Sequence, residues 1–360
     1  MRRWSLLVVV LLALLMLGTF ASAEEIMKIY FFDVGQADAT LLKGPDFTVL
    51  IDAGDYRRND VVPHLKSVGV TELDLLIGTH PHADHIGQFP QVLETFPVRE
   101  VWMSGTEHTT QTFERAVDAI LASEAGYHEP RSGEVFTFGS LRIDVLNPVE
   151  LTGDIHADGI VLRAVYGNLG IVFTGDAEEK TERAMVARGE PLQAMLLHLG
   201  HHGSSTSNSN TLIYAVNPNV VFYSAGEGNP YGHPHFEVID RIASMYLDIY
   251  GTDRNGTIRV ETTGRGYDIF PERGTRLGGP LAIREPAPST TPSEAQPSGT
   301  VNINTASVDE LQRIIHIGPA RAQDIIRLRP FRSVDDLTRV SGIGPARIAD
   351  IKAQGVAYVD

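Results

Sequence analysis

Several residues of types that bind metal ions lie close together in one short stretch, Thr79 to Gly87. The stretch reads THPHADHIG, and its candidate ligands are His80, His82, Asp84 and His85. Imidazole and carboxylate groups in combination suit Zn²⁺, Mn²⁺ or iron. A regular strand or helix cannot direct all of them to one point, because residues on one face recur every two positions in a strand and every three to four in a helix. We therefore expect a loop that leaves the apolar segment LDLLIGT and brings the ligands together.

More candidates follow other apolar segments, where a strand is expected to end. FTGDAEE contains Asp176, LHLGHHGSS contains His201 and His202, and YGHPH contains His233 and His235. Any one of these alone is more typical of a surface or core position than of a metal site. As a set they favour a distributed site, built on one edge of the sheets.

The elements that must position these residues alternate along the chain. IMKIYFFDVG, FTVLIDAG and GIVFTGD have the composition of strands. QTFERAVDAILASEA and FEVIDRIASM have helical spacing, and EEKTERAMVARG predicts a helix that ends at Gly189. Strand-rich halves with interspersed helices indicate an α/β sandwich.

Composition narrows the classes of protein. The chain has 360 residues, a net charge of −15 and no cysteine. The absence of cysteine excludes disulfides, thiolate metal ligands and a cysteine nucleophile. The negative charge argues against a protein that coats nucleic acid by bulk electrostatics, so any contact with nucleic acid must come from a local site.

The N-terminus has the three parts of a secretory signal peptide. Two arginines precede the apolar run Leu6 to Phe20, and ASA before Glu24 is a small-residue cleavage site. We expect residues 1–23 to be removed after Ala23 and the remainder to be secreted or extracytoplasmic, with no stable membrane span. An uncleaved anchor is the alternative, although the apolar run is short for a full span.

The remaining chain divides by composition into three parts. We expect an α/β domain at 24–277 and a Pro/Ser/Thr-rich extended linker at 278–300. The segment 301–360 is a small separate all-α domain with an internal repeat, IIHIGPARAQDII and VSGIGPARIADI. Each copy reads as helix, tight glycine turn and helix.

A known family shares these motifs. THPHADHIG matches the His-x-His-x-Asp-His motif of the metallo-β-lactamase superfamily. FDVGQADATLL, LIDAG, THPHADHIG, VFTGDAEE, LGHHGSSTS and NPYGHPH, in this order, resemble the metallo-β-lactamase domain of DNA-uptake competence proteins of the ComEC type. The resemblance covers roughly Met27 to Phe270. It implies an αβ/βα sandwich with two divalent metal ions, Zn²⁺ or Mn²⁺, between its sheets.

The resemblance also implies roles for single residues. The implied metal ligands are His80, His82, Asp84, His85, His156, Asp176 and His201. His80 and His82 would bind one ion, Asp84 and His85 the other, and Asp176 would bridge the two. Asp158 is an alternative to His156, and His202 is the less favoured alternative to His201.

Residues at nearby motif positions would hold these ligands in place by hydrogen bonds. They are Asp33, Gln36, Asp38, Asp52 and His202, and ordinary turn chemistry at strand ends is the alternative for each. Asp84 would also orient the attacking hydroxide. His233 would protonate a leaving oxygen or hold a phosphate, unless it only packs on the neighbouring proline.

The C-terminal repeat resembles the helix-hairpin-helix module of DNA-uptake receptor proteins, which also carries VNINTA followed by ELQ. A glycine turn before a helix exposes backbone N–H groups that suit a phosphate. The residues expected at the DNA backbone are Gly318, Gly342, Ile343, Gly344, Arg347 and Lys352, with Ile343 packed in the module's core. His316 stands where the family has glycine, so we expect the first hairpin to bind phosphate less well.

The segment has eight Lys/Arg and seven Asp/Glu, so its binding should rely on backbone amides and be independent of DNA sequence. A structural or protein-binding module is the alternative. Together these features predict a secreted metal-dependent nuclease or phosphodiesterase that acts on DNA. Two alternatives remain, namely hydrolysis of a small lactone, β-lactam or phosphoester, and a non-catalytic DNA-binding role in uptake.

Overall fold

The computed structural model describes residues 25–274 and 300–359, except residue 341. The predicted signal peptide and nearly all of the predicted linker lie outside the described residues, so both stay predictions. Within the described part of the chain, no helix is long and apolar enough to cross a membrane.

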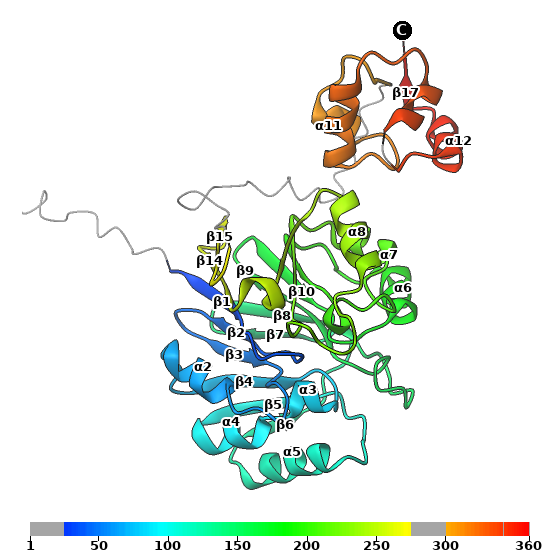
Figure 1. The fold of residues 1–360 in the computed structure, drawn as a ribbon. Coiled ribbons are helices and arrows are strands. Elements are labelled where there is room, and N and C mark those ends of the chain that lie inside the picture. The colour runs from blue at the N-terminus through cyan, green and yellow to red at the C-terminus, as the bar shows by residue number, and fades with distance from the viewer. Residues whose placement is uncertain (1–24, 275–299, 341, 360) are drawn as a thin grey trace, which may run out of the picture.

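Two β-sheets form the centre of the larger unit (Figure 1). The first sheet has the order β15 (Tyr267–Pro271), β14 (Ile258–Thr262), β1 (Met27–Phe31), β2 (Thr40–Lys43), β3 (Thr48–Ile51), β4 (Leu73–Gly78), β5 (Val98–Met103) and β6 (Gly126–His128). The second sheet has the order β13 (Asp248–Gly251), β12 (Val220–Tyr223), β11 (Leu196–His198), β10 (Leu169–Phe173), β9 (Val161–Tyr166), β8 (Leu141–Asn147) and β7 (Val135–Phe138).

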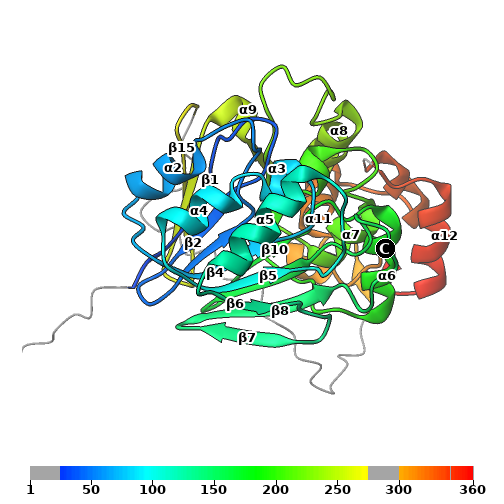
Figure 2. The same ribbon diagram turned by 90° about the horizontal axis from the view of Figure 1, so that it is seen from below.

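Helices cover the outer face of each sheet. The first sheet carries α2 (Val61–Ser67), α3 (Ala83–Ile86), α4 (Phe89–Thr95) and α5 (Gln111–Ala122), and Figure 2 shows α4 and α5 lying over its strands. The second sheet carries α6 (Glu179–Arg188), α7 (Asn210–Val216) and α8 (Phe236–Ser244), with the short elements η1 (His201–Gly203) and α9 (Thr252–Asn255) in nearby loops. One buried apolar cluster fills the space between the two sheets. A second cluster lies between the first sheet and its helices, and a third lies between the second sheet and its helices. The predicted αβ/βα sandwich is therefore confirmed.

Sequence patterns explain these elements locally. Strand β10, LGIVF, is buried along its whole length because both of its faces are covered, so it shows no alternation of polar and apolar residues. Helix α5 begins after Thr110, whose side chain accepts a hydrogen bond from the amide of Phe113. Helix α6 ends at Gly189 in the left-handed conformation, as its sequence predicts.

Parallel pairing sets where the polar loops meet. Strands β3 and β4 run parallel in the first sheet, and β10, β11 and β12 run parallel in the second. The carboxyl ends of parallel strands lie at the same edge of a sheet, which is the usual place for a site. Asp52 follows β3, His80 follows β4, Asp176 follows β10 and His201 follows β11. The fold thus delivers the candidate ligands to one edge of the sandwich.

The C-terminal unit is a small helical body with its own buried apolar cluster. Its elements are α10 (Val308–Leu311), α11 (Pro319–Leu328), η2 (Val334–Arg339) and α12 (Pro345–Gln354), with β16 (Val301–Asn302) and β17 (Ala357–Tyr358) paired in parallel. The short ladder joins the two ends of the unit and adds to the all-α body expected from the sequence. Ser307 and Glu310 form a capping box at the start of α10.

Candidate metal centre

Histidines that follow β4 and the aspartate that follows β10 belong to a first group of candidate ligands. His80, His82, His156 and Asp176 each offer one atom, and these atoms lie within 4.8 Å of one another. The Nε2 atom of His80 is 3.0 Å from Nδ1 of His82 and 3.4 Å from Oδ2 of Asp176. Imidazole nitrogens and a carboxylate oxygen around a common point suit a divalent transition metal ion.

A second group lies on the other side of Asp176. Nε2 of His85 is 3.4 Å from Oδ1 of Asp176 and 3.9 Å from Oδ2 of Asp84, which in turn is 3.1 Å from Nε2 of His202. Nε2 of His85 and Oδ1 of Asp176 are buried and have no hydrogen-bond partner among the described residues. Buried polar atoms without partners are rare because leaving them unsatisfied is costly. A bound cation would satisfy both atoms, so the residues present fit a metal ion.

Asp38 competes with Asp84 for a place in the second group. Atoms of Asp38, His85, Asp176 and His202 also lie within 4.8 Å of one another. However, Oδ2 of Asp38 is 3.9 Å from Nδ1 of His85 and 3.7 Å from Nδ1 of His202. Both Nδ1 atoms already have close acceptors, Oδ2 of Asp52 at 2.8 Å and a backbone carbonyl oxygen at 3.0 Å. The Nε2 atoms therefore face Asp84, and Asp38 lies behind the rings.

The stretch that contains the four clustered candidates is not a single loop. His80 and His82 lie in a loop, but Asp84 and His85 belong to the one-turn helix α3, which begins after His82. The amides of His85 and Ile86 both donate to the carbonyl oxygen of His82, at 3.1 Å each, so local hydrogen bonds favour the turn of helix. The expectation of a loop for all four residues was wrong in this respect.

When no metal is bound, the close contacts between histidines and aspartates of the second group shift their pKa values in opposite directions. Burial disfavours the charged form of His202, but Asp38, Asp84 and Asp176 outweigh it and raise the pKa of His202 to about 9. Burial also opposes the charge of His85, and its pKa is nevertheless raised by the same kind of carboxylate contacts. Conversely, nearby histidines outweigh burial and lower the pKa values of Asp84 and Asp176.

The first group has the opposite behaviour. Burial, then the neighbouring His85, lower the pKa of His80. Burial, then His80 and His85, lower the pKa of His82 to about 4. Neutral imidazole is the form that binds a metal ion. His80 and His82 are therefore already in their binding form at neutral pH, whereas His85 and His202 of the second group must release protons.

His156 reaches the first group from the loop between β8 and β9. Its ring lies 5.8 Å from the ring of His80 and 5.1 Å from that of His82. Asp158, the alternative, is fully buried and accepts hydrogen bonds from the amides of Thr152 and Gly153. His156 therefore lies beside the first group, whereas Asp158 stabilises the loop through hydrogen bonds to its backbone.

The resemblance implies His201 as the ligand, but of these two adjacent histidines it is His202 that lies against Asp84 of the second group. Both have left-handed backbone conformations, with φ of 53° and 55°, a strained arrangement for two successive side chains. His202 points to the second group, whereas Nε2 of His201 is 3.8 Å from Oδ2 of Asp176. His201 also forms a third set of candidate ligands with His156 and Glu178.

Asp52 connects the two groups, because it accepts hydrogen bonds both from Thr79, which precedes His80, and from His85. It has a φ of 59° and accepts hydrogen bonds from the amide and hydroxyl of Thr79, at 2.8 Å each, and from Nδ1 of His85 at 2.8 Å. A carboxylate on Nδ1 orients the ring and makes Nε2 a better ligand. Asp33 has no such role among the described residues, since its carboxylate contacts the amide of Gly35 and the guanidinium of Arg273.

Replacing Asp52 with Asn is expected to weaken metal binding roughly 10- to 100-fold, because the ring of His85 loses its anionic partner. Asparagine tolerates the left-handed backbone at this position. A competitive titration against a chromophoric chelator measures the change. Asp33→Asn is the matched control and should bind metal as the wild type does; equal losses in the two variants would contradict the assignment.

Gln36 orients His233 rather than a metal-ligand candidate. Its Oε1 accepts from the amide of Gly226 at 3.1 Å, which turns its Nε2 toward Nδ1 of His233 at 3.3 Å. Nδ1 of His233 then accepts a hydrogen bond from Gln36, so the hydrogen of the neutral ring is on Nε2. Burial, then the neighbouring His202, lower the pKa of His233 to about 4, which keeps the ring neutral. His233 is therefore a hydrogen-bond donor beside the two groups.

Two further residues near the groups were not among those predicted from the sequence. His198 ends β11 inside an apolar run, and its Nε2 lies 3.6 Å from Oδ1 of Asp38 and 3.1 Å from the hydroxyl of Ser224. Glu178 lies 3.7 Å from Nδ1 of His156. The run LLHLGHH offered a weak signal for His198, since a histidine within a buried strand needs polar partners.

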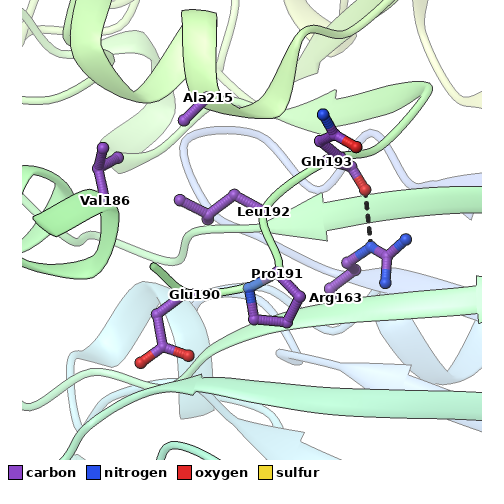
Figure 3. Close-up of a pocket in the computed structure, with 7 residues that line it drawn as sticks. All are labelled: Arg163, Val186, Glu190, Pro191, Leu192, Gln193 and Ala215. Atoms are coloured by element: carbon purple, nitrogen blue, oxygen red, sulfur yellow. Dashed lines mark hydrogen bonds between the residues drawn. The ribbon is translucent and has the colours of Figure 1, made fainter. Parts of the chain in front are cut away.

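A separate pocket is lined by residues that include Glu190 and Gln193, which precede β11, whereas His201 follows this strand (Figure 3). It has a volume of about 360 Å³. Arg163 donates to the carbonyl oxygen of Gln193 at 2.7 Å and to Asp144 at 3.1 Å, and Glu190 accepts from Ser132 at 2.7 Å. The charged groups of this pocket are engaged in structural contacts, so it adds nothing to the candidate site.

The C-terminal hairpins present two similar helix starts. Gly318 precedes α11 and Gly344 precedes α12, and a Cβ at either position would meet no atom within 4 Å. His316 has a φ of 68°, close to the 74° of Gly342, so it occupies the same turn position. His316 also lies 2.8 Å from Asp350 of α12.

The other residues predicted to bind DNA have structural contacts. Ile343 is buried in the core of the unit. Arg347 donates to the carbonyl oxygen of Gly342, and the ammonium of Lys352 donates to Asp335 at 2.6 Å. The exposed helix starts are thus the clearest feature that could receive a phosphate.

Comparison with known families agrees with this architecture. Residues 32–227 match the model of the Metallo-beta-lactamase superfamily. The chain belongs to the metallo-β-lactamase superfamily. Residues 296–354 of this superfamily member match the Helix-hairpin-helix motif.

Its relatives include three longer proteins. ComE operon protein 3 of Bacillus subtilis is 26% identical over 69% of this chain and 35% of its own length. Competence protein ComA of Neisseria gonorrhoeae is 28% identical over 71% of this chain and 36% of its own length. Recombination protein 2 of Haemophilus influenzae is 28% identical over 63% of this chain and 28% of its own length. The chain therefore spans about a third of the length of these relatives. The solved metallo-beta-lactamase fold protein YhfI of Bacillus subtilis overlaps 63% of this chain and 96% of its own, with 13% identity and a TM-score of 0.44.

Proposed function

We propose that this protein is a secreted phosphodiesterase that uses two divalent metal ions, Zn²⁺ or Mn²⁺, to cleave DNA. The position of Asp176 carries the proposal, because Oδ2 faces His80 and Oδ1 faces His85, each at 3.4 Å. A carboxylate with one oxygen toward each group is suited to bridge two ions. His80, His82, His156 and Asp176 would hold the first ion. Asp84, His85, Asp176 and His202 would hold the second.

Bound ions of this kind activate water and stabilise negative charge on a phosphoryl or acyl group. The chain's own residues contribute orientation and proton donation. The Asp84 side chain is 31% exposed, whereas those of Asp38, Asp52 and Asp176 are at most 7% exposed. Asp84 is therefore placed to accept a hydrogen bond from the attacking water, and its lowered pKa keeps it ionised.

His233 is the proposed partner of the leaving group. Gln36 fixes its Nε2–H as a donor, and its ring lies 5.7 Å from that of His201 and 6.1 Å from that of His202. A neutral donor at this distance can bind a non-bridging phosphate oxygen or hydrogen-bond to the departing oxygen. The assignment of DNA as substrate is supported by the helix-hairpin-helix motif and by relatives whose names refer to competence and recombination.

The decisive test is hydrolysis by purified protein loaded with Mn²⁺ or Zn²⁺. Plasmid and single-stranded DNA should be cleaved, and nitrocefin and paraoxon should not. His82→Ala should abolish cleavage, while His128→Ala should not, because His128 pairs with Glu134 away from the ligands. Hydrolysis of nitrocefin or paraoxon without cleavage of DNA would replace the proposal with a small-molecule hydrolase. DNA binding without any turnover would favour a non-catalytic accessory.

The two hairpins should contribute unequally to DNA binding. Gly344→Ala is expected to weaken binding roughly tenfold, because the methyl group projects beside exposed N–H groups and hinders a charge-assisted hydrogen bond. Gly318→Ala should have a smaller effect, since the first hairpin has His316 at the turn position where the second has Gly342. Neither glycine has a positive φ, so both variants should fold. Fluorescence anisotropy at one fixed salt concentration measures both, and equal effects would contradict the prediction.

A further inference from the structure

One exposed aromatic ring lies beside the candidate metal centre. Tyr231, in the loop between β12 and α8, is 64% exposed. Its ring is stacked on that of His233, with 5.8 Å between centroids and 27° between planes. His233 in turn neighbours His201 and His202. A group that stacked on the exposed face of Tyr231 would therefore be held next to the reacting centre.

The loop holds this ring in a fixed place. Oδ1 of Asn229 accepts from the amides of Tyr231 and His233, at 3.1 and 3.0 Å, and its Nδ2 donates to the carbonyl oxygens of Gly226 and His233. Gln36 anchors the same loop from the first sheet. A ring that is already fixed loses little conformational freedom when a ligand stacks on it, which strengthens binding.

A second aromatic residue lies on another loop at the edge of the centre. Tyr56 is 44% exposed, and the guanidinium groups of Arg57 and Arg115 lie 5.7 and 6.0 Å from the centre of its ring. A Cβ at Gly87 would lie 2.1 Å from the amide nitrogen of Tyr56, so this loop packs directly on the end of α3. Asp84 and His85 lie on the same short helix.

Charge around Tyr56 is not simply positive. Asp55 accepts two hydrogen bonds from the guanidinium of Arg57, at 2.9 and 2.7 Å, and Asp60 pairs with Arg58. Among the described residues, Arg115 has only uncharged partners, Gln111 and the ring of Tyr56. The cluster thus offers planar groups for stacking and a modest positive charge. It is not a broad basic surface of the kind that holds duplex DNA by its phosphates.

We propose that Tyr231, with the cluster of Tyr56, Arg57 and Arg115, binds unpaired nucleotides next to the phosphodiester to be cleaved. This inference rests on the proposed phosphodiesterase function and assigns unpaired strands as the preferred form of its nucleic-acid substrate. Bases in a duplex are stacked on one another, so only unpaired bases can use such rings. Stacking on aromatic and arginine side chains tolerates any base and needs little net charge. It therefore suits a chain with a net charge of −15.

The test compares two short substrates for the full-length, Mn²⁺-loaded protein. One is the tetranucleotide dT4, and the other is a tetramer of abasic sites with the same number of phosphates. Tyr231→Ala should lower kcat/KM for dT4 by roughly 5- to 100-fold and leave cleavage of the abasic tetramer unchanged. Tyr231→Phe should behave as the wild type. Tyr127→Ala is the matched control, because Tyr127 is 52% exposed on the edge strand β6.

Each alternative outcome has a distinct meaning. Unchanged cleavage of dT4 by Tyr231→Ala overturns the inference and leaves the phosphodiesterase proposal intact. Equal losses on both substrates show that Tyr231 only supports His233, which also overturns it. If the wild type cleaves neither substrate, the phosphodiesterase proposal fails, and calorimetric titration with dT4 then decides. Binding that Tyr231→Ala loses supports the stacking site, and binding that it retains overturns it.

Discussion

Asp176→Asn is expected to lose at least about 1,000-fold in kcat/KM on any phosphodiester that the wild type cleaves. Such a loss corresponds to roughly 4 kcal/mol of transition-state stabilisation, within the range that metal ions supply. Asp176 is the residue whose two oxygens face the two groups separately, each 3.4 Å from a histidine nitrogen. Asparagine keeps the shape but offers one neutral oxygen. Steady-state kinetics and metal analysis of the same preparation measure both consequences.

The matched control for this variant is Asp38→Asn. Asp38 is also a buried aspartate within reach of His85 and His202, but it lies at their Nδ1 atoms. It should keep its bound metal and most of its activity, whereas Asp176→Asn should lose metal from both groups. Equal metal loss in the two variants would place Asp38 among the ligands and contradict the assignment of Asp84.

Removal of metal by a chelator is expected to lower the melting temperature by roughly 10 °C at pH 8. The difference in melting temperature between the metal-loaded and the metal-free protein should widen between pH 6.5 and pH 9. In the metal-free protein the pKa of His202 is raised to about 9 from its ordinary value of 6.5. Its stabilising charge is therefore fully present below pH 6.5 and is lost as the pH rises through 9, an effect on the order of 3 kcal/mol.

The stability of the metal-loaded protein should rise between pH 6.5 and pH 9, where that of the metal-free protein falls. His85 and His202 must be neutral to bind a metal ion, so affinity rises with pH. The lowered pKa values of Asp84 and Asp176 matter only at acidic pH, where protonation removes their contribution. Thermal melts with and without chelator, at constant ionic strength, test the prediction. A difference that stays constant or narrows toward pH 9 would contradict it.

Much of the fold could be read from the sequence because its signals are local. The buried run LGIVF and the glycine at the end of α6 specify a strand and a helix end without reference to the rest of the chain. The spacing of THPHADHIG likewise indicated that its ligands would converge. The one-turn helix within it was missed, because a turn of four residues is too short to leave a periodic pattern.

Contacts between distant segments could not be read in this way. Gln36 and His233 are 197 residues apart, and only the packing of the two sheets brings them within 3.3 Å. The choice between His201 and His202 depends on two successive left-handed residues. Sequence spacing carries no information about such ring directions, so adjacent histidines could not be told apart. Tyr231 was also overlooked, because an aromatic residue in a loop has no pattern that marks it as exposed.

The ligand candidates divide between the two sheets, and this division bears on the order of assembly. His80, His82, Asp84 and His85 come from the N-terminal half of the larger unit, and His156, Asp176 and His202 come from the C-terminal half. Neither half alone holds a complete set of candidate ligands for either of the two proposed ions. The newly made chain must therefore bring both sheets together before it captures metal, so metal uptake should mark the end of folding rather than guide its beginning.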